Sequence, residues 1–242
     1  NNCTIDFNGS ELVFHDKLQP ITIDHCENIQ IKNCSIDWDI PLTAEGQVMA
    51  VADNYIDISI DVLQFPYVIE NGKLFFVGEG WKSKLWEWGV MEFEKDSKLI
   101  AAKTGDESCL GDYSKYVANE IKYGLVRLSN QFTRKPALGN YLVLRHSARD
   151  HAGTFIVHSK NVQIENIDMF QNGGLGLLAQ YSENILFKKV NVVPNAAKRR
   201  ILSGHDDGLH ISNCKGQVTV DSCKFLALMD DPINVHGTSV QV

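Results

Sequence analysis

The chain has 242 residues, of which 44% are hydrophobic and 22% are charged. This composition can build a sizeable core and excludes a disordered chain, and the length allows one large domain or two smaller ones. The formal net charge of −7 argues against a nucleic-acid partner, because nucleic-acid-binding proteins present basic faces. No apolar run approaches the roughly 18 residues of a membrane span, so we expect no such span.

A repeat runs through both ends of the chain. Four eight-residue segments align without gaps, with apolar residues at their first, third, sixth and eighth positions: 29–36, 162–169, 185–192 and 218–225. Two alternating pairs around a polar corner predict strand, turn and strand, with every second side chain pointing inward. Each segment follows a further corner and another short strand, and the spacing from Asn161 to Asn184 is 23 residues.

The repeat predicts an all-β fold, a right-handed parallel β-helix in which each turn has three short strands and three corners. Equivalent residues of successive turns should share one interior position, which the alignment assigns to Cys34, Ile167, Val190 and Cys223. A β-sandwich of ordinary hairpins is the alternative, although hairpins would not keep an eight-residue register at a constant period. The even number of cysteines, six, permits disulfides, but we expect small buried thiols.

Residues 40–145 interrupt the repeat with strand-like runs separated by turn signals. We therefore expect an antiparallel β-barrel or sandwich inserted between two turns of a β-helix formed by residues 1–39 and 146–242. After the insert, the spacing between two repeat segments grows to accommodate a loop that contains Lys198, Arg199 and Arg200. These basic residues either compensate nearby carboxylates or bind substrate.

Two pairs of adjacent carboxylates follow this loop, Asp206–Asp207 and Asp230–Asp231. Asp207 and Asp231 are 24 residues apart, which is close to one repeat. Both pairs should therefore lie on the same side of adjacent turns and form one patch. Crowded carboxylates shift one another's pKa values, and such groups concentrate at functional sites. Three histidines flank the pairs: His205, His210 and His236.

Three kinds of chemistry fit such a patch. Glycoside hydrolysis needs one protonated and one ionised carboxyl, and side chains splayed from turns about 4.8 Å apart can reach the ~6.5–9.5 Å separation of inverting enzymes. A calcium site in a polysaccharide lyase is the second possibility. The third is structural, because Asp–Gly and Asp–Pro steps form turns. Hydrolysis is favoured, because the two pairs are one turn apart and each is followed by a histidine.

The segments SGHDDGLHISNCKG and LMDDPINVHGT, with VLRHSARDHAGTFIV and GGLGLLAQYSENI upstream, resemble glycoside hydrolase family 110, the α-1,3-galactosidases. The resemblance covers essentially the whole chain. It implies a right-handed β-helix with inserted barrels, and removal of terminal α-1,3-linked galactose with inversion from blood-group B-type or linear glycans. It also implies a secreted or periplasmic bacterial enzyme that needs no metal or other cofactor.

By the family pattern, Asp207 is expected to be the general acid, and Asp230 with Asp231 to activate water, while Asp206 tunes its neighbour. The other residues expected to contact or orient the sugar are His205, His210, Asn234, His236, His151 and Arg149. Family members continue with more turns, so we expect this chain to be part of a longer protein that supplies the targeting segment. A non-catalytic glycan-binding β-helix and a calcium-dependent lyase stay open as alternatives, and no motif indicates an oligomeric state.

Overall fold

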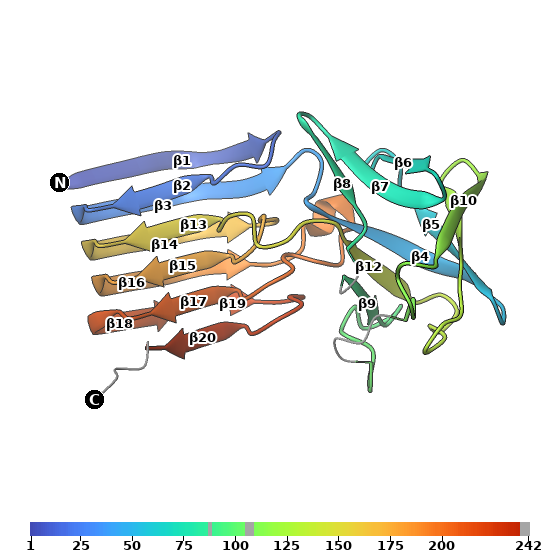
Figure 1. Ribbon diagram of the computed structural model, residues 1–242. Coiled ribbons are helices and arrows are strands. Elements are labelled where there is room, and N and C mark those ends of the chain that lie inside the picture. The colour runs from blue at the N-terminus through green and yellow to red at the C-terminus, as the bar shows by residue number, and fades with distance from the viewer. Residues whose placement is uncertain (87–88, 105–108, 238–242) are drawn as a thin grey trace. The chain divides into compact units, whose positions relative to one another are not determined.

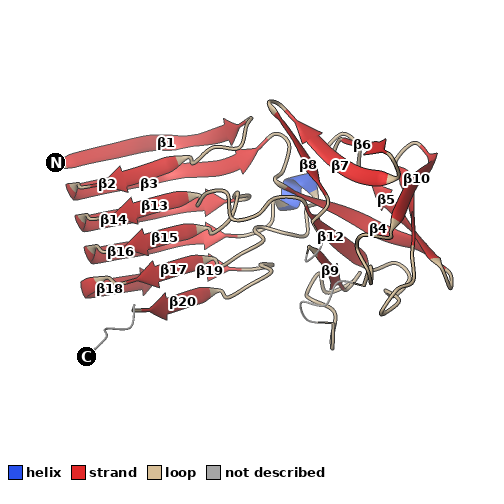
Figure 2. Ribbon diagram, viewed as in Figure 1, coloured by secondary structure: helices blue, strands red, loops and turns tan. Residues whose placement is uncertain are grey.

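The computed structural model of the chain is all-β (Figures 1 and 2). It describes residues 1–86, 89–104 and 109–237. Within these ranges the only helical segment is a short 3-10 turn, η1 (Ala196–Lys198). No helix in the described part of the chain is long and apolar enough to cross a membrane.

The chain divides into two compact units. One, the parallel unit, combines Asn1–Asp39 with Ala148–Val242, and the other, the antiparallel unit, is Ile40–Ser147. The strands of the first unit pair in parallel, whereas those of the second pair in antiparallel fashion. The predicted all-β fold with both kinds of sheet is therefore confirmed.

Two parallel sheets form the parallel unit. The first runs in the order β1 (Cys3–Phe14), β3 (Glu27–Trp38), β14 (Lys160–Met169), β16 (Glu183–Val192) and β18 (Lys215–Asp221), with β19 (Lys224–Phe225) also paired to β16. The second runs in the order β2 (Ile21–Asp24), β13 (Thr154–Val157), β15 (Leu177–Gln180), β17 (Leu209–Ser212) and β20 (Ile233–His236). Apart from β18 and β19, which follow each other in the first sheet, the strands alternate between the two sheets along the chain. Successive repeats therefore stack in the ladder of arrows seen in Figure 1.

The repeat segments stack in the register that their alignment predicts. Ile167 on β14 pairs with Cys34 on β3 and with Val190 on β16, and all three side chains are buried. The N–H of Val190 donates to the sulfur of the half-buried Cys223. This parallel pairing excludes the sandwich of hairpins.

The corner inside each repeat segment differs from the prediction of separate strands. Strands β3, β14 and β16 each continue through the corner as one bent strand. The bend uses a left-handed residue, which is Asn33 (φ 63°) in β3 and Asn166 (φ 51°) in β14. Asparagine visits this region more readily than most residues because its short polar side chain bonds locally. Here the Asn166 side-chain amide donates to the Asn33 side-chain oxygen at 2.9 Å, so the stacked corners are bonded to each other.

The antiparallel unit contains two sheets. The larger runs in the order β10 (Val117–Lys122), β11 (Leu125–Ser129), β5 (Tyr55–Ile60), β4 (Thr43–Val51), β12 (Tyr141–Arg145) and β9 (Val90–Phe93). The smaller consists of β6 (Tyr67–Glu70), β7 (Lys73–Gly78) and β8 (Trp81–Lys84). Inward-facing side chains of both sheets, such as Ile58, Phe76 and Leu142, form one core.

All six cysteines lie in described residues and are free thiols. Burial raises the pKa of the Cys34 thiol to about 11 and that of Cys109 to about 12, which leaves both protonated and unreactive at neutral pH. Cys3 is exposed, so the expectation of a buried thiol is wrong there. The reason is that Cys3 lies on β1, which is an edge strand of its sheet.

Candidate active site

The two carboxylate pairs lie on two loops of the parallel unit that stack on each other. Asp206 and Asp207 belong to the loop that leads into β17, and Asp230 and Asp231 to the loop that leads into β20. The N–H of Gly208 donates to the carbonyl of Asp231 at 2.9 Å, which joins the two loops directly after the carboxylates. The predicted meeting of the two pairs on one patch follows from this stacking.

Gly208 is needed for the close approach of these loops. A Cβ at this position would lie 2.6 Å from Cδ1 of Phe225 and 2.8 Å from the carbonyl oxygen of Pro232. Any side chain would therefore push the loops apart. Glycine lets the backbones approach and keeps Asp207 above the second pair.

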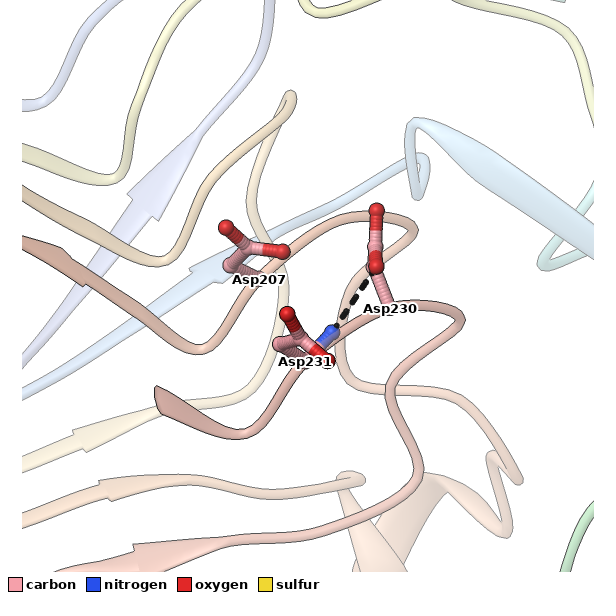
Figure 3. Close-up of side chains that lie close together, drawn as sticks. All are labelled: Asp207, Asp230 and Asp231. Atoms are coloured by element: carbon pink, nitrogen blue, oxygen red, sulfur yellow. Dashed lines mark hydrogen bonds between the residues drawn. The ribbon is translucent and has the colours of Figure 1, made fainter. Parts of the chain in front are cut away.

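Three of the four carboxylates point toward one another, as Figure 3 shows for Asp207, Asp230 and Asp231. One carboxylate oxygen from each lies within 4.8 Å of the others. Asp207 is only 2% exposed, whereas Asp230 and Asp231 are exposed. The N–H of Asp231 donates to Oδ1 of Asp230 at 3.0 Å, which fixes the second pair. The patch thus joins one buried carboxylate to two that solvent reaches.

The environment of Asp230 makes it a stronger base than an ordinary aspartate. Burial raises its pKa, and the negative charge of Asp207 raises it further. Arg149 opposes this shift, since its Nη2 lies 3.1 Å from Oδ2 of Asp230. The same guanidinium donates from Nε to Oδ1 of the buried Asp206 at 2.8 Å. Arg149 therefore bridges the two loops through one carboxylate of each pair.

Histidines contact the first pair on both sides. His205 and Asp206 are both buried, and Nδ1 of His205 lies 3.0 Å from Oδ2 of Asp206. His210 bonds through Nδ1 to Oδ2 of Asp207 at 2.6 Å, and through Nε2 to Nε2 of His236 at 2.8 Å. The structure thus brings His205, His210 and His236 to the carboxylates, as predicted from the sequence. Their contacts are with protein groups, which suits orienting roles.

The remaining predicted residues are less directly engaged. Asn234 lies on β20 in register with His210, beside the patch. His151 stacks on Trp38 with ring centroids 6.2 Å apart. Both of its ring nitrogens are shielded from solvent and have no hydrogen-bond partner among the described residues, and burial lowers its pKa. Contact of Asn234 and His151 with a sugar stays a prediction.

The sequence did not single out Asp37, which anchors the loop that carries Asp207. Arg200 bonds to Oδ1 of Asp37 and donates from Nη2 to the carbonyl of Trp38 at 3.1 Å. Lys198 Nζ and the Asn195 amide donate to Oδ2 of Asp37 at 2.7 and 2.9 Å. Of the two roles expected for the basic loop, charge compensation therefore holds for Lys198 and Arg200. The carboxylate that both residues contact is Asp37.

The oxygens of three carboxylates of the patch are close enough together to contact one cation. Asp207, Asp230 and Asp231 could each offer one oxygen to a cation. Calcium requires about six to eight oxygen ligands, so three single oxygens would leave most of its coordination to water. This donor set does not favour a resident metal, and the chemistry below uses protein groups and water.

Comparison with known proteins agrees with the division of the chain into a parallel and an antiparallel unit. The family model described as GLAA-B beta-barrel domain I matches residues 44–142, which lie within the antiparallel unit. The whole chain also matches longer curated proteins, three of which are described below. It is 51% identical over 246 residues to α-1,3-galactosidase B of Bacteroides thetaiotaomicron, with 100% of this chain and 39% of the relative covered.

Two more distant relatives match equally completely. Identity is 34% over 241 residues with α-1,3-galactosidase A of Bacteroides fragilis, again over 100% of this chain and 39% of the relative. It is 30% over 242 residues with α-1,3-galactosidase B of Akkermansia muciniphila, over 100% of this chain and 30% of the relative. The resemblance to glycoside hydrolase family 110 is confirmed. This chain spans 30% to 39% of the length of these three relatives.

Proposed function

We propose that the protein is an exo-acting α-1,3-galactosidase that hydrolyses terminal α-1,3-linked galactose of blood-group B-type or linear glycans. The observation that carries the proposal is the approach of Asp207, Asp230 and Asp231, whose oxygens lie within 4.8 Å. Glycoside hydrolysis requires such a set of carboxyl groups in different protonation states. The names of the curated relatives supply the substrate, and the activity belongs to the longer protein.

In this mechanism Asp207 is the general acid. Its proton passes to the glycosidic oxygen as the bond from that oxygen to the anomeric carbon breaks. A water molecule bonds to the anomeric carbon and releases a proton to Asp230, assisted by Asp231. The raised pKa of Asp230 favours this transfer. Asp206, paired with Arg149, holds the loop and tunes the field at Asp207.

Inversion at the anomeric carbon is part of the proposal and rests on the family resemblance. One oxygen of each of the three carboxylates lies within 4.8 Å of the others, which is closer than the ~6.5–9.5 Å between carboxyl groups that is typical of inverting enzymes. Inversion therefore requires the solvent-exposed carboxylates of Asp230 and Asp231 to move away from Asp207 when the water molecule enters. The first anomer released by the enzyme decides the point, since inversion gives β-galactose.

The proposal extends to architecture and location. We infer that residues 1–39 and 146–242 form a right-handed parallel β-helix that carries the catalytic site, and that residues 40–145 form an inserted β-barrel. The alternation of strands between two parallel sheets supports the helix. A terminal glycan as substrate supports a secreted or periplasmic location.

The test measures galactose release from α-1,3-galactobiose and from a B-type glycan by the full-length protein, with the anomer followed by NMR. We expect β-galactose first, and loss of about 10²-fold or more in kcat for Asp207→Asn. Asp24→Asn is the matched control, because Asp24 is exposed on β2 and bonds only locally to His25. Binding without cleavage would instead indicate a glycan-binding protein. A chelator-sensitive, ultraviolet-absorbing product would indicate a lyase.

A further inference from the structure

Asp207, His210 and His236 form a chain of hydrogen bonds from the interior to the surface. Oδ2 of Asp207 lies 2.6 Å from Nδ1 of His210, and Nε2 of His210 lies 2.8 Å from Nε2 of His236. Exposure rises along the chain: the Asp207 side chain is 3% exposed, that of His210 is 15% exposed, and His236 is exposed. The most buried carboxylate of the candidate site is therefore connected to solvent through two imidazoles.

The strand register produces this chain. His210 on β17 pairs with Asn234 on β20, and His236 follows two residues later on the same face of the sheet. Their rings meet edge to face, with centroids 4.8 Å apart and planes at 88°. Asp207 precedes His210 by three residues, so its carboxylate reaches the other ring nitrogen.

The contact between the two Nε2 atoms restricts their protonation. A neutral imidazole carries one N–H and one acceptor nitrogen, so a bond between two Nε2 atoms needs the proton on only one of them. When Asp207 is protonated, its O–H donates to Nδ1 of His210, and Nε2–H of His210 donates to His236. When Asp207 is ionised, every bond reverses: His236 donates to His210, which donates to the carboxylate. The direction of the chain therefore reports the state of Asp207.

We propose that His210 and His236 form a proton relay that reloads Asp207 after each turnover. The inference rests on the proposed function, in which Asp207 gives its proton to the leaving oxygen. A proton from solvent binds Nδ1 of His236, the Nε2 proton of His236 moves to Nε2 of His210, and the Nδ1 proton of His210 moves to Asp207. One proton enters and one is delivered, so both imidazoles end neutral but in the opposite tautomers. Exchange of their ring protons with solvent restores the starting tautomers before the next cycle. Both are positioning residues, because they act through Asp207.

The register neighbours of His210 carry no titratable side chain. In register beside His210 are Leu178 on β15 and Asn234 on β20, and neither titrates. Among the described residues, the charged groups lie at the inner end, where Asp230 and Asp231 approach Asp207 and the guanidinium of Arg149 pairs with Asp206 and Asp230.

The experiment uses the full-length protein, weakly buffered, with His236→Asn. Its matched control is His158→Asn, because His158 is an exposed histidine of the parallel unit that stacks between His25 and Tyr181. On α-1,3-galactobiose we expect kcat of His236→Asn to fall about tenfold with KM unchanged, and added imidazole to restore it. On nitrophenyl α-galactoside the rate should not change, because nitrophenolate leaves without a proton. The control should match the wild type on both substrates.

Two results would overturn the relay while leaving the proposed function in place. One is a wild-type rate for His236→Asn on the galactobiose without imidazole. The other is an equal loss on both substrates that imidazole does not repair, which indicates a structural role. A wild-type protein that releases no galactose would instead overturn the proposed function itself.

A second measurement needs no turnover. Nitrogen-15 NMR of the neutral histidines should find a proton on Nε2 of only one of His210 and His236. Protons on both Nε2 atoms, or on neither, would refute the hydrogen bond between the two rings.

Discussion

Arg200 and Asp37 form an ion pair that solvent hardly reaches, with side chains 2% and 0% exposed. Asp37 lies near the end of β3, whereas Arg200 belongs to the loop that leads to Asp207. The ion pair therefore connects β3 to the loop that carries Asp207, the buried carboxylate of the three that approach one another. The loop's position depends on a contact between residues that are 163 positions apart in the sequence.

Replacement of Asp37 should destabilise the parallel unit strongly. In Asp37→Ala the guanidinium of Arg200 stays buried without the Asp37 carboxylate, and breaking a buried ion pair in this way costs about 3–5 kcal/mol. Urea unfolding of the full-length protein measures the loss. Asp24→Ala, which removes an exposed carboxylate of the same unit, should leave the unfolding free energy unchanged. Similar midpoints for the two variants would contradict the proposed anchoring.

Acid should weaken the same contact. Burial alone would raise the pKa of Asp37, but the charge of Arg200 and hydrogen bonds from Lys198 and Arg200 outweigh it and lower the pKa. A carboxyl with a lowered folded-state pKa stabilises the fold above its unfolded value of about 3.9, and the contribution is lost as pH falls through the folded value. The difference in unfolding free energy between wild type and Asp37→Asn should be largest at neutral pH and should shrink below about pH 4. A difference that stays constant down to pH 2 would count against the pair.

Arg149 should set the acid limb of the pH profile. Its positive charge holds down the pKa of Asp230, which burial and Asp207 raise. Arg149→Ala should therefore raise that pKa further and move the acid limb of kcat/KM to higher pH, because the base must be ionised to accept a proton. Arg149→Lys keeps the charge but not the two-point contact with Asp206 and Asp230, so it should move the limb less. Movement of the limb to lower pH would refute the assignment of Asp230 as the base.

Two glycines of the parallel unit offer a paired test of the loop stacking. In Gly208→Ala the new methyl meets Phe225 and the Pro232 carbonyl at less than 3 Å, so we expect a loss of about 1–3 kcal/mol in stability together with reduced kcat. In Gly237→Ala the nearest atom to the new methyl is Oδ1 of Asn213 at 3.9 Å, and the change should be tolerated. Thermal melting and galactose release compare the two variants. Equal effects would show that close approach at Gly208 is not what orders the site.

The repeat made the parallel sheets and the carboxylate patch predictable. Inward positions recur at a nearly constant spacing, so Ile164 could be placed against Ile31 and Phe187 before any coordinates, as the strand pairs confirm. Asp207 and Asp231 are separated by almost one repeat, and their proximity follows from the same spacing. Periodic contacts leave a signal in the sequence because each turn makes the same pairings.

Contacts that do not repeat left no such signal. Asp37 precedes the antiparallel unit and Arg200 follows it, and no spacing relates the two residues. The bend of β3 at Asn33 was predicted as a corner, but the continuation of one strand on both sides of it was not, since pairing depends on the neighbouring turns. The bond from His210 to His236 could have been found, because Asn234 is the register partner of His210 and the next outward residue on β20 is His236.

The interruption of the parallel unit sets an order for its assembly. Only β15 separates β14 from β16 in the sequence, and Asn184 bonds to Asn161 across 23 residues, whereas Asn161 bonds to Asn28 across 133 residues. Closing the longer loop costs more chain entropy, so nucleation is favoured among β13–β20, with β1–β3 docking last. The turns formed by β13–β20 contain both Asp pairs of the candidate site. We therefore expect these turns to fold first and the N-terminal strands to pair with them afterwards.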